Sequence, residues 1–412
     1  MRSGNVLISG AGIAGPALAY WLRRHGCTPT IVERATAPRH GGQAVDIRGT
    51  ARDVVTRMGI MDQVRACHTG THGIAYVDAR NRRLAAMRGE DFGHSGGIIA
   101  ELEILRGDLV RILQDAAGDV EYLYGDTITG LADGPDGVDV TFAHAAPRRF
   151  DVVVGADGLG SGVRRLAFGD DSAHVHDLGY YAAYYAARTD LALDGWELLY
   201  SMPAGNGVRG RLVMLYPIGD TGEVRAMFAF AAPHAQHDRE DPAAQRALLA
   251  QVFAGEGWQV PNLLRQLDSV DDLHFTRAGE VRLDRWSAGR SVLLGDAAFG
   301  GSVGMGTSMA LVGAYVLAGE LAAADGDHTV AFAAYEREMR EYVTASRTRP
   351  PGGVNGFLPA TRTGIRLRTL VMRALPHLPG KEKMMGGIDT AASLIQLKDY
   401  DRTAAAPLST PE

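Results

Sequence analysis

The chain opens with two short apolar runs that flank a longer segment with helical spacing. The apolar run Val6–Ser9 is typical of a short buried strand, and the run Thr30–Val32 of a second one. Between them, Ala17–Arg24 carries apolar residues at the spacing of a helix. This order predicts a strand–helix–strand unit that ends at Glu33.

A different pattern fills the segment between Asp171 and Glu280. Turn sequences such as PAGNG and GDTG separate the short β-like runs GYYAAYYAARTD, WELLYSM, GRLVMLYPIGD and EVRAMFAFAAP. These runs predict an antiparallel sheet rather than further strand–helix–strand units. The segment AQRALLAQVFAGEGWQVPNLLRQL then predicts helices.

Length and composition set the broad class of the protein. A chain of 412 residues is long for one core, so we expect two domains, and either a monomer or a homodimer. The net charge of −6 argues against nucleic acid or an anionic membrane as a main partner. Only two cysteines, no signal-peptide pattern and no apolar run that we judge able to span a membrane favour a cytoplasmic protein.

Histidine and cysteine come close together at two places, which raises the question of a metal site. Cys67, His68 and His72 form one group, and His174 and His176 form the other. Neither group has a second cluster at the spacing of a zinc site, so we predict no metal. The sequence also contains no Gly-x-Ser-x-Gly elbow of a hydrolase.

The turn after the first apolar run introduces the chemistry. Gly10, Gly12 and Gly15 form the pattern Gly-x-Gly-x-x-Gly between strand and helix. The first glycine permits a tight turn, the second lets the backbone approach a pyrophosphate, and the third allows close packing. Glu33 lies where a carboxylate accepts hydrogen bonds from an adenosine ribose. The sequence therefore predicts a dinucleotide site, whose turn also includes Ala11, Ile13 and Ala14.

Two classes of dinucleotide-binding enzyme are compatible with this turn. An NAD(P)-dependent dehydrogenase usually continues directly with more strand–helix units. Residues 35–59 instead give a glycine-rich loop, a short strand and a helix, which is not a second phosphate-binding turn. This order favours an FAD enzyme.

Two later motifs make the pattern specific. Residues 151–169 (DVVVGADGLGSGVRRLAFG) run from a strand into Asp157-Gly158, and residues 291–321 run through Gly295-Asp296 into an alanine-rich helix. Residues 41–49 (GGQAVDIRG) and 104–113 (ILRGDLVRIL) lie between the first turn and residues 151–169. Taken with the first turn and Glu33-Arg34, residues 1–345 resemble the single-component flavoprotein monooxygenases, the p-hydroxybenzoate-hydroxylase-like aromatic hydroxylases. Within that family they are most similar to the group with tetracycline-inactivating monooxygenases.

The resemblance implies one FAD held at both ends. Asp296 would accept a hydrogen bond from the ribityl chain, and the helix that begins near Gly306 would stabilise negative charge on the reduced flavin. Arg48 resembles an arginine near the pyrophosphate and flavin, Arg106 a residue at the ribityl phosphate, and Asp157 an aspartate that serves FAD and NAD(P)H. The implied FAD contacts are Gly10, Ala11, Gly12, Ile13, Ala14, Gly15, Glu33, Arg34, Arg48, Arg106, Asp157, Gly295, Asp296, Gly304, Met305, Gly306 and Thr307.

Each of these assignments has a structural alternative. Arg48 and Arg106 could form surface salt bridges, and Asp157 could cap the helix that follows it. We name no firm catalytic residue, and Arg48 is the one candidate.

The implied activity is that of an FAD-dependent monooxygenase. NAD(P)H would reduce FAD, O₂ would add at flavin C4a, and the hydroperoxide would hydroxylate the substrate or carry out a Baeyer–Villiger oxidation. The chain has no second Gly-x-Gly-x-x-Gly, which agrees with transient binding of the pyridine nucleotide. The alternatives are a flavin oxidase or dehydrogenase on the same scaffold, and a flavin- or ligand-binding protein without activity.

The loop after Gly295-Asp296 departs from the family pattern. Phe299 stands where relatives generally have histidine or tyrosine, the family prolines are missing, and Met305 replaces a glutamine. Proline stiffens a loop, so this loop has more conformational freedom. Either neutral drift or an altered flavin environment, which would favour the oxidase alternative, explains the change.

Candidate substrate contacts come from the predicted antiparallel sheet, which would lie over the flavin. Along residues 211–216, even-numbered residues share one face and odd-numbered residues share the other. One face must line a pocket, and alternation does not say which. The apolar and aromatic lining favours a hydrophobic, aromatic or polycyclic substrate. The candidates are Arg211, Val213, Met214, Tyr216 and Met227.

The predicted fold is therefore α/β: a Rossmann-like FAD-binding domain of the glutathione-reductase type with an inserted α+β substrate domain and C-terminal helices. We assign 1–75, 96–172 and 281–345 to the FAD-binding domain, 76–95 and 173–280 to the substrate domain, and 346–412 to the C-terminal helical segment. In that last segment, an apolar stripe among arginines could lie on a membrane surface, but we favour packing across the two domains. The stripe consists of Ile365, Leu367, Leu370, Val371 and Leu375.

Overall fold

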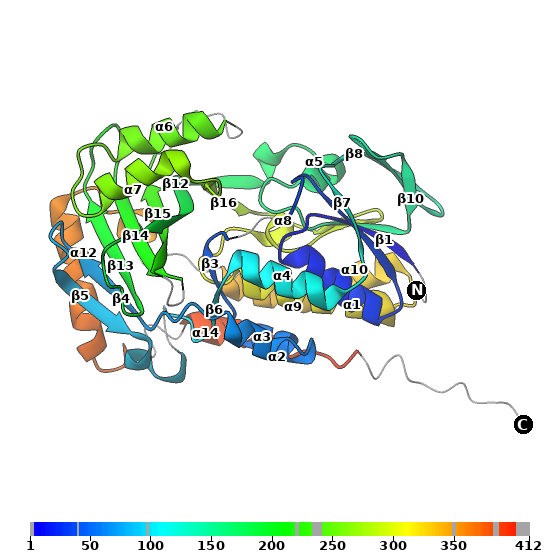
Figure 1. Cartoon of the computed structure of the whole chain (residues 1–412). Coiled ribbons are helices and arrows are strands. Elements are labelled where there is room, and N and C mark those ends of the chain that lie inside the picture. The colour runs from blue at the N-terminus through cyan, green and yellow to red at the C-terminus, as the bar shows by residue number, and fades with distance from the viewer. Residues whose placement is uncertain are drawn as a thin grey trace, which may run out of the picture.

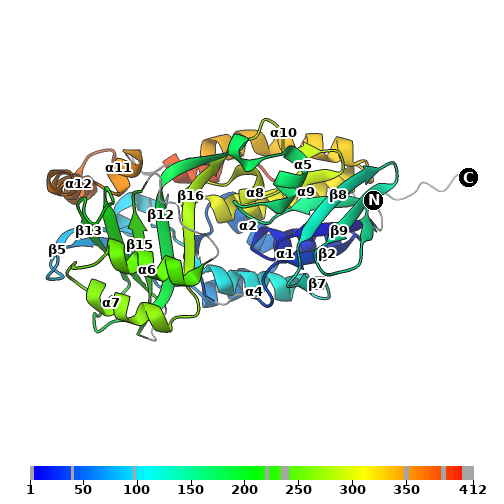
Figure 2. The same ribbon diagram turned by 90° about the horizontal axis from the view of Figure 1, so that it is seen from above.

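The computed structural model describes residues 4–38, 41–95, 99–218, 222–232, 241–347, 352–381 and 387–400. The molecule is elongated, with one sheet near the N-terminus and a second sheet at the opposite end (Figures 1 and 2). The chain passes between these two parts several times, so residues far apart in the sequence meet at their junction.

The strand–helix–strand unit expected at the start of the chain is confirmed. It consists of β1 (Asn5–Ser9), α1 (Ala14–Arg24) and β2 (Thr28–Glu33), and the two strands are parallel. The helix begins three residues earlier than predicted. Pro16 is compatible with this start because the first turn of a helix does not need its missing N–H group.

β1 lies inside a six-stranded sheet of order β17-β18-β11-β1-β2-β7. Its neighbouring pairs are parallel except for β17 and β18. Helices α4 and α9 pack against α1 beside this sheet, and α10 packs against α9. The bounds of these elements are β7 Glu121–Tyr124, β11 Val152–Gly155, β17 Ser287–Ala288, β18 Ser291–Leu293, α4 Arg106–Ala117, α9 Gly306–Ala323 and α10 His328–Ser346.

Smaller elements complete this part of the molecule. A two-stranded ladder joins β3 to β6, and a three-stranded sheet has the order β10-β9-β8. The bounds are β3 Ala44–Asp46, β6 Glu103–Leu105, β8 Ile128–Gly134, β9 Gly137–Phe142, β10 Arg148–Phe150, α2 Thr50–Arg57, α3 Met61–Ala66, α5 Gly162–Phe168, α8 Asp296–Phe299, η1 Gly89–Ser95 and η2 Asp171–Ala173.

The second sheet has seven strands in the order β16-β12-β15-β14-β13-β4-β5. It is antiparallel except at β13 and β4, which run parallel. The antiparallel pairing predicted between Asp171 and Glu280 is confirmed, because β12 to β15 pair antiparallel with one another. Strands β4 and β13 are far apart in the sequence, so no tight turn joins them and they can pair in parallel. The bounds are β4 Gly73–Val77, β5 Arg83–Arg88, β12 Val175–Arg188, β13 Trp196–Met202, β14 Arg211–Pro217, β15 Glu223–Phe230, β16 His274–Val281, α6 Pro242–Val252, α7 Val260–Gln266 and η3 Leu267–Ser269.

The two faces of the seven-stranded sheet belong to different apolar clusters. One face packs with residues of α6 and α7, including Leu249 and Leu263, which are fully buried. The opposite face forms a separate cluster around Leu199, Leu212 and Met227. We call this second surface the inner face of the sheet.

Helix α9 is almost wholly buried in the core of the nucleotide-binding part. Its length and composition would suffice for a membrane span, so the expectation that the chain has no such run was wrong on these two criteria. Because 78% of the relevant window is buried inside the protein, α9 has the character of a core helix.

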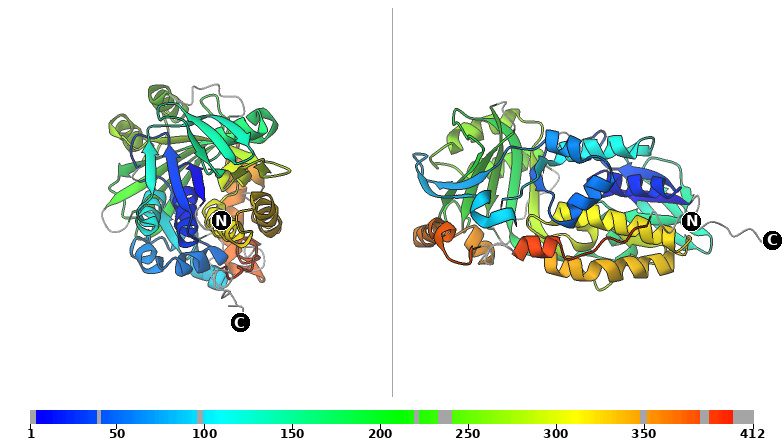
Figure 3. Two further views of the ribbon diagram at one scale, coloured as in Figure 1. Left: turned by 90° about the vertical axis from the view of Figure 1, so that its right-hand side faces the viewer. Right: turned by 90° about the horizontal axis from the view of Figure 1, so that it is seen from below.

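The C-terminal part continues with α11 (Gly353–Phe357), α12 (Arg362–Ala374), η4 (Leu375–His377) and α14 (Gly387–Ala392). Helix α12 packs on β5 and β13, both in the seven-stranded sheet, rather than across the two parts as we had favoured. The chain then returns to α9, where Tyr400 donates a hydrogen bond to Glu320 (2.7 Å). Figure 3 shows this return beside α10.

The predicted fold class is confirmed: a parallel nucleotide-binding sheet is combined with a second part built on a mostly antiparallel sheet. The exact residue ranges of the domains stay a proposal. The sharing of one sheet by β4, β5 and β12–β16 supports the choice of a discontinuous arrangement.

Candidate active site

The first turn needs glycine because neighbouring backbone atoms approach it closely. Gly10 has a φ of +106°, and a Cβ there would lie 2.6 Å from the carbonyl oxygen of Ala156. A Cβ at Gly15 would lie 2.0 Å from the carbonyl oxygen of Gly10, so this glycine lets α1 start directly against the turn. A Cβ at Gly12 would lie 3.0 Å from the Arg106 guanidinium. The turn therefore opens toward Arg106.

Glu33 is fixed at the end of β2 by two backbone donors. Its carboxylate accepts hydrogen bonds from the N–H groups of Ala11 (2.8 Å) and Ala35 (2.9 Å). These bonds orient the carboxylate beside the glycine turn. Arg34 follows Glu33 and is exposed to solvent.

The loop after β18 packs against the start of α1, so motifs from opposite ends of the chain meet. Gly295 has a φ of +64°, and a Cβ there would lie 3.2 Å from the methyl group of Ala14. The next residue, Asp296, carries a carboxylate that solvent reaches even though protein atoms surround it. Burial raises the pKa of Asp296, and the charge of Arg106 opposes this rise. Such an environment suits a carboxylate that accepts a hydrogen bond from a bound hydroxyl group.

Two helix N-termini at this site lack a side-chain cap. The first residues of α1 and of α9 have no side chain that accepts their free N–H groups. By contrast, Asp327 caps α10 and Thr361 caps α12. Free N–H groups at the positive end of a helix are available to an anionic or electron-rich ligand.

Arg48 is buried at the start of α9, with 2% of its side chain exposed. It pairs with Asp46 (3.0 Å) and with Asp389 of α14 (3.5 Å), and its backbone N–H donates to Ser308 Oγ (2.9 Å). Burial raises the pKa of Asp46 to about 6, against the lowering effect of Arg48. The surface salt bridge considered for Arg48 is therefore replaced by a buried ion pair.

Asp157 does cap a helix, as the structural alternative supposed. Its Oδ2 accepts hydrogen bonds from the N–H groups of Gly162 (2.8 Å) and Val163 (3.2 Å) of α5. Its Oδ1 is buried without a hydrogen-bond partner among the described residues. The residue also lies under the first turn, since a Cβ at Gly10 would come within 2.9 Å of its Cα. One carboxylate oxygen of Asp157 is therefore committed to the helix start, and the other has no protein donor among the described residues.

Most of the predicted FAD contacts form one continuous track. Arg106 links Gly12 to Asp296, and a Cβ at Gly306 would lie 3.5 Å from Asp296 Oδ1. A Cβ at Gly304 would lie 3.2 Å from Asp46 Oδ2, which connects the track to Arg48. Met305 differs from the others because its side chain is fully buried, which leaves only its backbone for a ligand. An extended dinucleotide with a ring system at one end fits this set of uncapped helices, glycines and a solvated carboxylate.

The candidate substrate contacts divide between the two faces of the seven-stranded sheet. Met214 and Met227 are cross-strand partners on the inner face, and Tyr184 continues the row on β12. Tyr216 lies on the same side as Met214 and accepts a hydrogen bond from the N–H group of Ala44 (3.1 Å).

Arg211 and Val213 lie on the opposite face. Val213 belongs to the cluster covered by α6 and α7, and Arg211 donates to the carbonyl of Val252 (2.8 Å) and pairs with Glu256 (2.7 Å). The structure therefore does not bring these two residues together with the other three candidates.

The junction holds a buried acidic group that was not predicted from the sequence. Glu103 of β6 faces Asp46 across the β3–β6 ladder, and Glu197 of β13 lies against Glu103. Burial, together with the charges of Glu103 and Asp46, raises the pKa of Glu197 well above its ordinary value. The available sequence signal was one acid among apolar residues in each of two runs, Glu103 in LEIL and Glu197 in WELLYSM.

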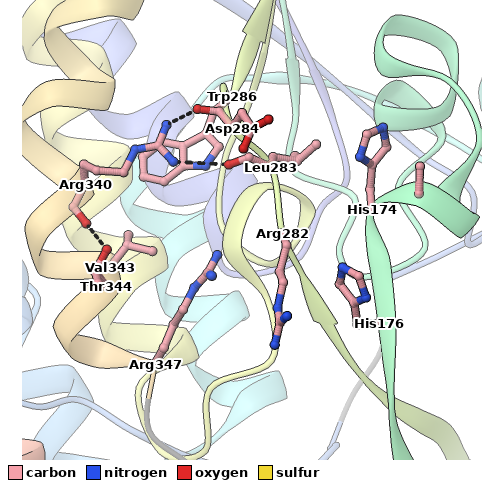
Figure 4. A pocket seen from close by; sticks show the side chains of 11 residues that line it. His174, His176, Arg282, Leu283, Asp284, Trp286, Arg340, Val343, Thr344 and Arg347 are labelled. Carbon is pink, nitrogen blue, oxygen red and sulfur yellow. Dashed lines mark hydrogen bonds between the residues drawn. The ribbon is translucent and has the colours of Figure 1, made fainter.

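A cavity of about 430 Å³ lies between α10, the chain after β16 and the start of β12. Figure 4 shows Arg340 of α10 directed at the segment after β16, where it donates hydrogen bonds to the carbonyls of Leu283 and Asp284. His174 and His176 also line the cavity, but none of its lining residues is a predicted FAD contact. Within the described residues, no group of three or more His, Cys, Asp or Glu side chains could hold a metal ion.

Comparisons with known proteins agree with this site. Residues 4–347 match the family model described as FAD binding domain. The chain is 38% identical over 344 residues to a flavin-dependent monooxygenase of an unknown prokaryotic organism, covering 83% of this chain and 87% of that protein. It is 40% identical over 362 residues to an uncharacterized protein of Mycobacterium tuberculosis, covering 86% of this chain and 94% of that protein.

A similar solved structure is that of the tetracycline destructase Tet(51). It has a TM-score of 0.80 and 31% identity, and the match covers 96% of this chain and 100% of that one. The chain therefore belongs to the FAD-binding family of flavin-dependent monooxygenases. The family resemblance and the FAD cofactor are confirmed, while the individual contact residues stay predictions.

Proposed function

We propose that this protein uses NAD(P)H and O₂ to insert one oxygen atom into a hydrophobic, aromatic or polycyclic small molecule. The hydrogen bond from the Ala44 N–H group to Tyr216 Oη (3.1 Å) carries the proposal. It joins β3, which holds Asp46 and leads to Arg48, to the inner face of the seven-stranded sheet. A substrate on that face would lie beside the residues proposed to hold the flavin.

The residues of the track would divide the binding of FAD between them. The start of α1 would bind the pyrophosphate, Glu33 the adenosine ribose, and Asp296 the ribityl chain. Bound FAD supplies the two-electron chemistry with NAD(P)H and O₂. The start of α9 would stabilise negative charge at the near end of the ring system, and Arg48 would hold a positive charge there.

The inner face would exclude water and bind the substrate through apolar contact. A row of side chains crosses it from β12 to β4, in the order Tyr184, Met227, Met214, Leu199 and Tyr76. Burial raises the pKa of Tyr184 and of Tyr76, so both phenols remain neutral at physiological pH. Neutral tyrosines and methionines suit an aromatic ligand.

The test is a panel of aromatic and polycyclic compounds, with a tetracycline as the first member because of the similar destructase. We expect at least one compound to stimulate consumption of NADPH or NADH and to gain one oxygen atom in mass. With heavy-isotope O₂ the product should carry the label. Substrate oxidation without nicotinamide would instead indicate an oxidase, and a bound flavin that neither nicotinamide reduces would indicate a binding protein.

Two variants make the test specific to the inner face. Met214→Ala should alter the KM or the ranking of substrates within the panel, because Met214 belongs to the proposed lining. Val213→Ala, its neighbour on the covered face, is the matched control and should leave the ranking unchanged. Equal changes in substrate ranking for both variants would contradict the proposed pocket.

A further inference from the structure

Helix α12 presents its apolar residues to solvent. Leu367, Leu370 and Val371 are 63%, 62% and 50% exposed, and Leu378 after the helix is 41% exposed. Residues three and four apart share one side of a helix, so the three helical side chains form one outward stripe. We call these four residues the outward patch.

The inward side of α12 is held by other residues. The Arg368 guanidinium donates to the carbonyl of Phe357 (2.8 Å) and to Ser201 Oγ, and it lies 4.7 Å from the centre of the Tyr76 ring. Burial lowers the pKa of Arg368, against the opposing effect of Tyr76. Leu375 is buried in a small cluster with Met87. The helix is therefore anchored by residues other than the outward patch. A surface helix usually buries its apolar stripe, whereas α12 exposes it.

Unpaired positive charge flanks the outward patch. Arg362, Arg366 and Arg373 are exposed, and within the described part of the chain none of them forms an ion pair. At 100° per residue, all three project to the same flank of the patch. The sequence has no Asp or Glu between Glu341 and Glu382, although the whole chain carries a net charge of −6. The basic charge is thus concentrated in this segment.

The position of α12 suits contact with an extended surface. The helix stands at the outer end of the molecule, remote from the N-terminus and from the nucleotide-binding sheet (Figures 1 and 3). Tyr400, the last described residue, lies in the opposite part of the molecule, because its ring packs against Gly319 of α9. A helix at one end of the molecule can lie flat on a surface while its inward side stays packed against the sheet through Arg368.

We propose that α12 docks the enzyme onto an anionic lipid surface, with the outward patch in the acyl-chain boundary and the three arginines at the headgroups. An apolar stripe beside basic residues is the pattern by which helices bind such surfaces. A second copy of the chain fits less well, since self-pairing would bring these arginines together with no acidic residue of the segment to offset them. The proposal is independent of the reaction proposed above.

The test uses the full-length, FAD-loaded protein and sedimentation with vesicles. We expect about tenfold more protein on phosphatidylcholine vesicles with about one third phosphatidylglycerol than on pure phosphatidylcholine. Binding should fall when NaCl rises from about 0.1 M to about 0.5 M, because salt screens the arginines. Equal binding to both vesicle types, or none to either, would overturn the proposal.

Variants separate the apolar contribution from the charged one. The triple variant Leu367→Ser, Leu370→Ser, Val371→Ser and the double variant Arg366→Glu, Arg373→Glu should each lose most of the anionic-vesicle binding. The matched control is Val330→Ser on α10, whose side chain is 57% exposed, and it should bind as the parent does. Bound-flavin absorbance reports correct folding for each variant.

Sedimentation velocity without lipid addresses the second-copy alternative. A monomeric parent protein supports the proposal. A dimer that the triple variant converts to a monomer, with no vesicle binding by the parent, would assign the patch to self-association and refute lipid docking.

Discussion

In the six-stranded part, the groups that line the proposed FAD track are mostly backbone: glycines at Gly10, Gly12 and Gly304, and the free N–H groups at the starts of α1 and α9. In the seven-stranded part, the proposed ligand contacts are side chains on one face of a sheet. The first kind of contact depends on local chain geometry, and the second depends on what covers each face.

The two parts should therefore respond differently to substitutions. Backbone contacts leave little freedom, since any side chain at Gly10 or Gly15 meets a carbonyl oxygen. Side-chain contacts on the inner face can vary in size and polarity while the sheet persists. We therefore expect substitutions in the nucleotide-binding part to lower stability and FAD binding together. Substitutions on the inner face should instead change which substrates are bound.

The largest effect should come from Gly15→Ala. Its Cβ would lie 2.0 Å from the carbonyl oxygen of Gly10, so α1 must move, and we expect a loss of stability above about 3 kcal/mol together with loss of bound flavin. Thermal unfolding and visible absorbance measure both. The control is Gly26→Ala, whose φ is +83° with open space around it, and which should cost about 1 kcal/mol and keep the flavin. A yellow, stable Gly15→Ala protein would falsify the proposed turn.

Asp296→Ala should weaken FAD binding while leaving the fold intact. A hydrogen bond to a charged acceptor contributes about 1.5–3 kcal/mol, so we expect a rise of about 10- to 100-fold in the Kd of FAD. Titration of the flavin-free protein, followed by fluorescence, measures the Kd. Asp327→Ala, which removes only the cap of α10, is the control and should change stability but not the Kd. Equal Kd values for Asp296→Ala and the parent would remove Asp296 from the track.

A pair of adjacent substitutions compares the two faces of the seven-stranded sheet. Val213→Ala should lower the free energy of unfolding by about 1–3 kcal/mol, because Val213 is fully buried beneath α6 and α7. Met214→Ala should cost less stability, because Met214 is only partly buried. Denaturant unfolding gives both values. The comparison fails if Met214→Ala is the more destabilising of the two.

The smallest effect concerns pH. The native pKa of Glu197 is raised, so the native state keeps a proton that the unfolded state loses, and stability falls as pH rises above the ordinary value of 4.5. Glu197→Gln lacks this titration. The Tm of the variant relative to the parent should therefore increase between about pH 5 and about pH 8.

A surface control shows whether this pH effect is local. Asp268→Asn removes an exposed carboxyl of η3 and is the control, since a rise of the Tm difference with pH should be specific to Glu197→Gln. A constant Tm difference for Glu197→Gln across this range would show that the carboxyl does not remain protonated in the native state.

The elements at the start of the chain could be predicted because their signals are local. The order of apolar strand, glycines and helix between Val6 and Arg24 fixes both the unit and its turn. The helix predicted near Gly306 begins at that residue for the same reason. Helix α12 was also predicted, but its orientation was not, since the burial of Arg368 depends on Tyr76, Ser201 and Phe357 from three other segments.

In the candidate site, too, local features could be predicted and tertiary contacts could not. Asp46 lies two residues before Arg48, and alternation in a strand could have placed it on the same side. The contact between Glu103 and Glu197 had no comparable signal, because the residues around each glutamate do not indicate that β6 and β13 lie next to each other.

The order of amino acids is enough to specify the glycine turns and the helices that follow them, and with these the FAD-binding character of the chain, because backbone conformation responds to immediate neighbours. The tertiary structure alone decided which face of the seven-stranded sheet meets β3, that Arg48 pairs with both Asp46 and Asp389, and that α12 turns its leucines outward. Those outcomes depend on which surfaces the fold brings into contact, and side-chain burial is set by those contacts.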